Sequence, residues 1–324
     1  MENGKWKMES EHVTSIAKSM FGLNNFLNAG VVLSRISHLA SRIPSSFSIL
    51  ILLSIFLASA AYAQKPPATK VSFTQEVDVL DEFVERFNNQ DRLLNKQYEQ
   101  IKNRRTPHQT RAFLLKGLFN YQNKEWNLLD MKSFVQSVTD STSPRFLKFA
   151  DQNWFAELFA TVDHGGKSEK ISLILRFEQG PLFSRWLLVG ARGNLLKAAT
   201  ADSLPALVKP IDTLRGINPA AHGNDFISLY RALDDRKNLR CYADRNELHH
   251  PELNRFLRLL QAGRISISQI DHVVYHFMQV DGWIFTVSCF PYKPQNSSGW
   301  LIGQLYPANE PIKAQYRKRI LNLF

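Results

Sequence analysis

The stretch Asp271–Pro307 decides the fold of this chain, and it reads DHVVYHFMQVDGWIFTVSCFPYKPQNSSGWLIGQLYP. Two segments of alternating character, His272–Val280 and Trp283–Phe290, flank the dipeptide Asp281–Gly282. An Asp-Gly pair between alternating segments is a strong signal for a hairpin. A third segment, Trp300–Tyr306, follows a turn-rich gap. The stretch therefore predicts a meander of three antiparallel strands.

A second set of three strands is predicted upstream. Its segments are Trp154–Asp163, Ile171–Glu178 and Arg185–Ala191, and residues typical of turns separate them. Apolar residues occupy every second position of the middle segment, which is typical of a strand with one buried face. The chain is therefore predicted to contain two meanders of the same kind.

Helical patterns precede both predicted meanders. Apolar residues three and four positions apart indicate the helices, and proline or a capping residue marks several of their starts. The first helical pattern is Val77–Ile101, in which Asn88–Asp91 is either a break between two helices or a polar notch in one. The other predicted helices are one that begins at Pro107, Leu128–Val138, one capped by Asn224, and one from Pro251 to the stop at Gly263. The tail Lys313–Phe324 is predicted to be a short basic helix or a frayed end.

The order of these elements predicts an α+β protein. We expect two tandem units of helices packed on a curved antiparallel sheet, at residues 73–200 and 224–324. The segment 201–223 contains three prolines and is predicted to be the linker between the units. The alternative is one larger, irregular α+β domain.

This arrangement resembles the cystatin-like and nuclear-transport-factor-2-like family of cone-shaped α+β folds. The resemblance covers roughly Phe73–Gly193 and Asp225–Tyr306. It rests on element order and on the strand segments Ile171–Phe177, Arg185–Ala191 and Trp283–Phe290. It implies a helix-covered sheet around an apolar cavity. The family includes small-molecule lyases and isomerases and also non-catalytic binding and assembly modules, and none of its catalytic motifs is matched here.

The N-terminal region resembles an export signal. The apolar run Phe47–Ala60 is about fourteen residues long, which is short of the roughly twenty that span a bilayer. Ala61-Tyr62-Ala63 follows and fits a signal-peptidase site. We expect cleavage between Ala63 and Gln64, so that residues 1–63 are a signal peptide and residues 64–72 a linker.

Two alternatives to this interpretation of the leader stay open. The charged region ahead of the apolar run is unusually long, which raises the question whether translation starts at Met1 or Met20. If cleavage does not occur, residues 47–61 would anchor the chain in a membrane. Export predicts a periplasmic or extracellular protein, and the anchor predicts a tethered one.

The 324-residue chain has a formal net charge of +11, and its charges are scattered. A basic surface permits contact with anionic glycans, phosphates or lipid. We expect a protein partner or a small apolar or glycan ligand, no nucleic acid, and a membrane only if the leader is retained. No glycine-rich phosphate-binding motif occurs, and no cofactor or metal is expected.

The weak candidates for catalytic residues are Asp271, His272 and His276. Even spacing places the two histidines on one face of a strand, about 13 Å apart, which is too far to share a metal. Asp271 and His272 are neighbours on a strand, so we expect their side chains to point to opposite faces. We favour the interpretation that these three residues are polar side chains that face solvent.

The chain contains two cysteines, Cys241 and Cys289. In an oxidising compartment they could form one disulfide bond, but Cys289 also fits an ordinary strand residue. Whether the two residues meet is left open at this point.

Export without a catalytic constellation predicts a non-catalytic binding or assembly protein of the cell envelope. One alternative is a cavity enzyme or small-ligand-binding protein, of the isomerase or hydrolase type found among cone-shaped folds. Another is a membrane-tethered component of a transport assembly, which applies if the leader is not cut.

Overall fold

The structure is a computed structural model, and it describes residues 79–91, 107–197, 204–209, 215–224, 226–291 and 299–323. All of these residues lie in the unit Ser72–Phe324. The predicted signal peptide, its cleavage between Ala63 and Gln64, and the alternative anchor at residues 47–61 lie outside the described residues.

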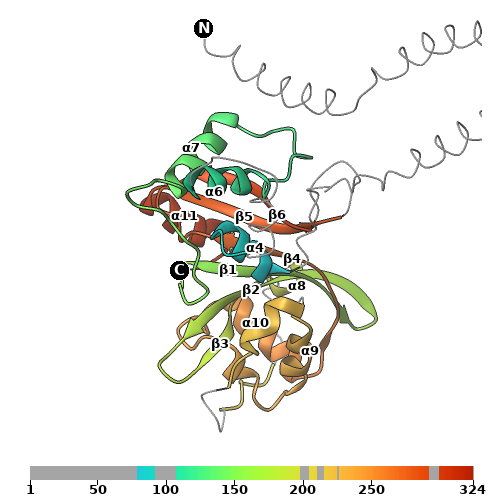
Figure 1. The fold of residues 1–324 in the computed structure, drawn as a ribbon. Coiled ribbons are helices and arrows are strands. Elements are labelled where there is room, and N and C mark those ends of the chain that lie inside the picture. Colours follow the sequence, from blue (N-terminus) through green and yellow to red (C-terminus); the bar gives the residue numbers. More distant parts are fainter. Residues whose placement is uncertain are drawn as a thin grey trace, which may run out of the picture. The chain divides into compact units, whose positions relative to one another are not determined.

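One antiparallel sheet of six strands, in the order β3-β2-β1-β4-β5-β6, organises this unit (Figure 1). The strands are β1 (Trp154–His164), β2 (Lys167–Gln179), β3 (Ser184–Arg192), β4 (Ile265–Phe277), β5 (Trp283–Phe290) and β6 (Gly299–Pro307). The predicted α+β class, with helices packed on a curved antiparallel sheet, is confirmed.

The two predicted meanders are present, but they share this one sheet. β1 pairs with β4 along its whole length, from Trp154 opposite Phe277 to His164 opposite Ile265. The expectation of a separate sheet in each half is therefore corrected. A single larger α+β domain, the alternative in the sequence analysis, fits the described residues better.

Strand β4 begins at Ile265, seven residues before the predicted start at His272. The register against β1 shifts twice, leaving Ser268 and Asp271 as extra residues on β4. Such β-bulges interrupt the alternation of side chains. The run from Ile265 to Asp271 consequently lacks the regular two-residue period by which strands are recognised in a sequence.

The hairpin between β4 and β5 is confirmed, with a longer loop than the Asp-Gly pair suggested. The first partners across it are Phe277 and Phe285. Gly282 has a φ of +79°, a conformation that glycine adopts without strain.

Helices cover the sheet. They are α4 (Leu80–Phe87), α6 (Pro107–Lys116), α7 (Leu128–Val138), α8 (Asn194–Lys197), α9 (Ile227–Asp234), α10 (Pro251–Gln261) and α11 (Glu310–Arg319), with short 3-10 helices η2 (Pro219–Asn224) and η3 (Leu239–Tyr242). The predicted starts at Pro107, Leu128 and Pro251 are confirmed. The predicted cap at Asn224 is wrong, because α9 begins after Phe226, which has a left-handed backbone. The short α8 was not predicted.

One face of the sheet carries a continuous chain of aromatic rings. Trp186 on β3 contacts Trp154 on β1, with ring centroids 4.7 Å apart. Trp154 stacks on Phe277 of β4 at 5.5 Å, and Phe277 stacks on Phe285 of β5 at 5.1 Å. Phe134 of α7 packs edge-on against Phe285. The two meanders therefore share one apolar interior on this side of the sheet. We call this side the helical face.

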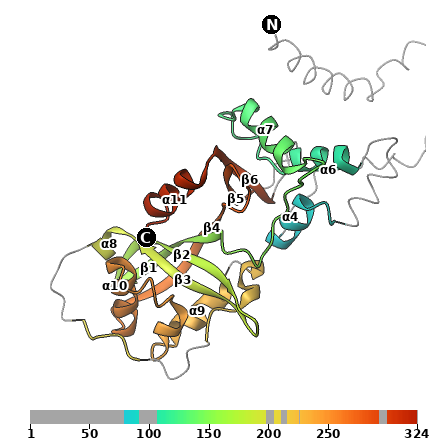
Figure 2. The same ribbon diagram turned by 90° about the vertical axis from the view of Figure 1, so that its left-hand side faces the viewer.

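The opposite face of the sheet is covered in part by α11 and the residues after it; Figure 2 shows α11 on the side of the sheet away from α9 and α10. Side chains of this face alternate with those of the helical face, as Phe155 does with Trp154. They form a second, smaller apolar cluster with the C-terminal segment: Phe155, Ile174, Val189, Met278, Ile284, Ala308, Leu321 and Leu323. A Cβ added at Gly190 would lie 3.3 Å from Leu323, so the tail lies close against β3.

Candidate functional site

Beside this smaller apolar cluster, five polar side chains meet beneath α11, and we call them the α11 network. They are Glu157 on β1, Ser172 on β2, Arg192 on β3, His276 on β4 and Tyr316 on α11. Glu157 and His276 are only 3% and 4% exposed. Burying such groups costs free energy unless they are paired, so their contacts decide whether this site is stable.

His276 bridges Tyr316 and Glu157. Its Nδ1 lies 2.8 Å from the Tyr316 hydroxyl oxygen, and its Nε2 lies 3.2 Å from Glu157 Oε2. A carboxylate only accepts hydrogen bonds, so Nε2 carries the proton and donates it to Glu157. In the neutral imidazole, Nδ1 then accepts the hydrogen bond from the Tyr316 hydroxyl. All three side chains are satisfied by this arrangement.

Arg192 approaches Glu157 from the other side. Its Nη2 forms an ion pair with Glu157 Oε1, and its Nε donates to the Ser172 hydroxyl at 3.2 Å. Its Nη1 donates to the carbonyl oxygen of Ile320, directly after α11. The guanidinium group therefore connects the buried carboxylate to the C-terminal segment that covers it.

The surroundings keep Glu157 charged. Burial opposes the charged form, but the hydrogen bond from His276 and the positive charge of Arg192 outweigh it. The pKa of Glu157 therefore lies below its ordinary value of 4.5. Burial raises the pKa of Tyr316 above its ordinary value, with smaller contributions from the nearby Tyr306 and Glu157. The phenol consequently stays protonated and acts as a donor.

A phenol, an imidazole and a carboxylate in a row can pass a proton along their hydrogen bonds. Here each group uses its hydrogen-bonding capacity on the next, and the row lies beneath α11. A substrate could reach the imidazole only if α11 moved away. As it stands, the network fastens the C-terminal helix to the middle of the sheet.

Beyond the end of α11, the same face of the sheet continues as an open surface. His272 on β4 stacks on Phe159 of β1, with ring centroids 4.2 Å apart and planes inclined by 9°. Phe159 is half-buried and His272 is exposed. The two predicted histidines therefore do share a face, as expected from their spacing, but they have separate partners.

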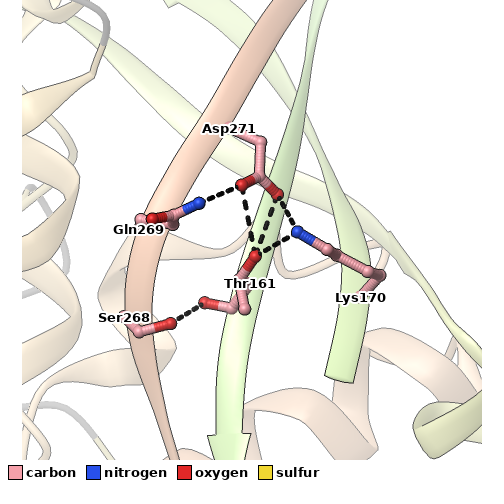
Figure 3. Close-up of polar contacts among 5 residues, drawn as sticks. All are labelled: Thr161, Lys170, Ser268, Gln269 and Asp271. Carbon is pink, nitrogen blue, oxygen red and sulfur yellow. Dashed lines mark hydrogen bonds and ion pairs between the residues drawn. The ribbon is translucent and has the colours of Figure 1, made fainter. Parts of the chain in front are cut away.

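Asp271 belongs to a second polar group on this face (Figure 3). Its carboxylate accepts hydrogen bonds from the Thr161 hydroxyl at 3.0 Å, from Lys170 Nζ at 2.9 Å and from the Gln269 amide. Ser268 donates to the backbone carbonyl oxygen of Thr161 at 2.9 Å. The side chain of Lys170 is 71% exposed, so this group lies at the surface.

The expectation that Asp271 and His272 point to opposite faces is wrong. Asp271 contacts Thr161, and His272 contacts Phe159, which lies two residues before Thr161 on the same face of β1. The β-bulge at Asp271 is the cause, because two residues on β4 then share one side of the sheet.

The acid at position 271 has a structural role in this arrangement. The hydrogen bond from Gln269, followed by that from Lys170, holds the pKa of Asp271 below its usual value. A carboxylate with these partners is a poor proton acceptor near neutral pH. We therefore assign Asp271 to the pairing of β1, β2 and β4 at the bulge.

The disulfide bond between Cys241 and Cys289 is not formed. Cys241 is buried in η3 beside β3, whereas Cys289 is exposed on β5. Four strand spacings separate β3 from β5 in the sheet, or about 19 Å. The Cα atoms of a disulfide lie about 4–7 Å apart, so this fold keeps the two thiols too far from each other.

The described part of the chain offers neither a metal site nor a membrane-spanning helix. No group of three or more His, Cys, Asp or Glu residues is arranged to hold a metal ion. No helix there has the length and apolar character needed to cross a bilayer.

Four members of the α11 network were not predicted from the sequence, namely Glu157, Ser172, Arg192 and Tyr316. Glu157 did carry a signal, because it is the single charged residue in the apolar segment Trp154–Val162. A charge in such a strand requires a partner. The identity of its partners depends on strands and a helix far away in the sequence.

Comparison of the chain with protein-family models, curated proteins and solved structures finds no match. The resemblance to cystatin-like and nuclear-transport-factor-2-like folds therefore stays a prediction.

Proposed function

We propose that this chain is an exported, non-catalytic binding or assembly protein of the cell envelope. The observation that carries the proposal is the filled helical face. Aromatic rings from β1, β3, β4, β5 and α7 contact one another there. A cone-shaped enzyme of the resembled family needs an apolar cavity at this place, and a binding module does not.

The way the ionisable groups are used also supports a binding role. Glu157 is held by His276 and Arg192, and Asp271 by Thr161, Lys170 and Gln269. These contacts stabilise the sheet and the C-terminal helix. A general base, by contrast, must have a pKa suited to accepting a proton, and both carboxylates have lowered pKa values.

The open part of the sheet beyond α11 is where we place the partner, either a protein or a small apolar or glycan ligand. The Phe159–His272 stack offers a flat, aromatic surface of the kind that packs against an apolar or sugar face. Lys170 and Gln269 lie farther along the same surface and supply donors at its rim.

Export is tested by N-terminal sequencing of the protein purified from fractionated cells. The proposal predicts an N-terminus at Gln64 and recovery with the periplasmic or extracellular fraction. A protein that retains residues 47–61 and fractionates with membranes would instead support the tethered transport component.

The contact surface is tested by placing a photocrosslinking amino acid at position 272 of the exported protein in living cells. The matched control places the same amino acid at Leu182, which is 97% exposed and lies in the turn between β2 and β3. The proposal predicts a discrete crosslinked species from position 272 that is missing from position 182. The same products from both positions would contradict it.

The row of Tyr316, His276 and Glu157 favours a second candidate, the cavity enzyme. That function would require α11 to leave the sheet so that the imidazole becomes accessible. It predicts rapid hydrogen exchange of the α11 amides in the native protein. Exchange as slow as in α10 would rule it out.

A further inference from the structure

The edge of the sheet at β3 carries a small cavity separate from the α11 network. Residue Ala243 bridges Leu188 of β3, and the Asp244 amide donates to the Leu188 carbonyl oxygen at 2.9 Å. The loop after η3 therefore runs along the edge strand. Beside it lies a cavity of about 300 Å³. The polar side chains that line it are those of Glu178, Arg185, Arg240, Asp244, Arg245 and Asn246.

Both carboxylates of this cavity already have cationic partners. Glu178 Oε2 accepts from Arg185 Nε at 2.7 Å. Asp244 Oδ2 forms an ion pair with Arg176 of β2, while its Oδ1 accepts a hydrogen bond from the backbone N–H of Asn246 at 2.8 Å. The negative charges on the cavity wall are thus balanced by Arg185 and Arg176.

Two guanidinium groups of the cavity, those of Arg240 and Arg245, are not used to balance its carboxylates. Within the described residues, no hydrogen bond or ion pair involves the side chain of Arg240 or Arg245. Arg240 is half-buried on η3 and Arg245 is exposed two residues beyond Ala243. Each guanidinium presents a planar fork of donors that matches the oxygens of a carboxylate or a phosphate.

We propose that this cavity binds a small dianionic ligand between Arg240 and Arg245. Two excess positive charges match two negative charges, and the volume is at the lower end of the range for small-molecule sites. The Asn246 side chain supplies a neutral polar group on the same wall. A phosphate group and a short dicarboxylate both have this chemistry, and the experiment separates them.

The test is calorimetric titration of the full chain with inorganic phosphate and, separately, with succinate. Binding of either ion at low ionic strength is expected, with an affinity that falls as salt is added, because screening weakens charge pairing. Tighter binding of phosphate identifies a phosphate-bearing ligand, and tighter binding of succinate a dicarboxylate. Absence of binding by both ions overturns the proposal.

Variants place the binding in this cavity. Arg240→Ala and Arg245→Ala should each weaken binding about tenfold or more, as expected for the loss of one charge-assisted hydrogen-bonding group. Arg240→Lys should retain part of the affinity, since the charge stays. The matched control is Arg231→Ala, which removes an exposed arginine on α9 and should leave the affinity unchanged.

Circular dichroism of every variant verifies that it is folded. Binding that is equally strong in wild type, Arg240→Ala and Arg245→Ala would overturn the assignment, as would an equal loss of binding in Arg231→Ala. The cavity is separate from the open surface at His272, so the proposed binding role does not depend on it. Failure to bind either ion would leave the crosslinking and export experiments unaffected.

Discussion

One face of the sheet carries a chain of aromatic rings from β3 to α7, whereas the other carries a buried glutamate and histidine and a half-buried arginine beneath α11. Apolar packing is non-directional, so many side-chain combinations can fill the helical face. A buried charge accepts few arrangements, because each hydrogen bond has a preferred geometry. We therefore expect the helical face to supply most of the stability, while the other face fixes where the C-terminal helix lies.

The largest effect is expected on the helical face. Trp154→Ala removes a fully buried side chain that contacts Trp186 and Phe277. The lost burial and the remaining cavity should lower the free energy of unfolding by about 3–5 kcal/mol. Urea denaturation monitored by far-UV circular dichroism measures this change. Tryptophan fluorescence is not used as the signal, because the variant lacks one tryptophan. Leu182→Ala, at a 97% exposed position, should change it by less than about 0.5 kcal/mol.

A smaller loss of stability is expected when the buried charge is removed from the opposite face. Glu157→Ala leaves Arg192 and His276 without their acceptor. Breaking a fully buried pair costs about 3–5 kcal/mol, but the side chain of Arg192 is 31% exposed and regains water. We therefore expect Glu157→Ala to lower the free energy of unfolding, measured by urea denaturation, by about 2 kcal/mol. The exposed control Glu125→Ala should show no comparable loss. A loss above that of Trp154→Ala would reverse the ranking of the two faces.

Removal of one hydroxyl should have a still smaller effect. Tyr316→Phe deletes the donor to His276 Nδ1 and keeps the ring by which α11 packs on the smaller apolar cluster. The loss of one buried hydrogen bond costs about 1 kcal/mol. Faster hydrogen exchange of the α11 amides should accompany it. Tyr121→Phe, at a 54% exposed position, is the control, and equal effects of the two variants would exclude a fastening role for Tyr316.

The smallest effect is expected at the bulge on the open part of the same face. Asp271→Asn removes the charge that pairs with Lys170 but keeps an acceptor oxygen. Because Lys170 is largely exposed, solvent screens the pair, and we expect a change of about 0.5 kcal/mol or less in the free energy of unfolding. A thermal unfolding scan suffices to detect a larger value, which would show that the bulge depends on this charge.

Much of the helical face could be predicted from the sequence, because its signals are local. The helical spacing in Leu128–Val138 identified a helix with its observed bounds. The alternation in Ile171–Phe177 identified a strand, although β2 begins four residues earlier, at Lys167. The pairing of β1 with β4 could not be predicted in the same way. Local periodicity does not indicate which strands become neighbours. The bulges at Ser268 and Asp271 also break the alternating pattern in the first half of β4, so that half could not be recognised as a strand.

The α11 network was recognised only through His276. Its partners come from β1, β2, β3 and α11, so the site exists only after the sheet has formed across both halves of the chain. The isolated charge at Glu157 indicated that a partner was needed. The partner itself, Arg192, lies 35 residues away on a strand that is not a neighbour of β1 in the sheet.

The most direct test of this account is the pH dependence of stability in wild type and in Glu157→Gln. Because the pKa of Glu157 is lowered on folding, its charge stabilises the folded state fully above the unfolded-state pKa of about 4.5. The stabilisation is lost as the pH falls below 4.5 toward the lower folded-state pKa. The account predicts that wild type exceeds Glu157→Gln in free energy of unfolding by a constant amount between about pH 6 and 8, and that this difference shrinks below pH 4.5. A difference that does not change on acidification, or that grows, would contradict a buried, charged Glu157 beneath α11.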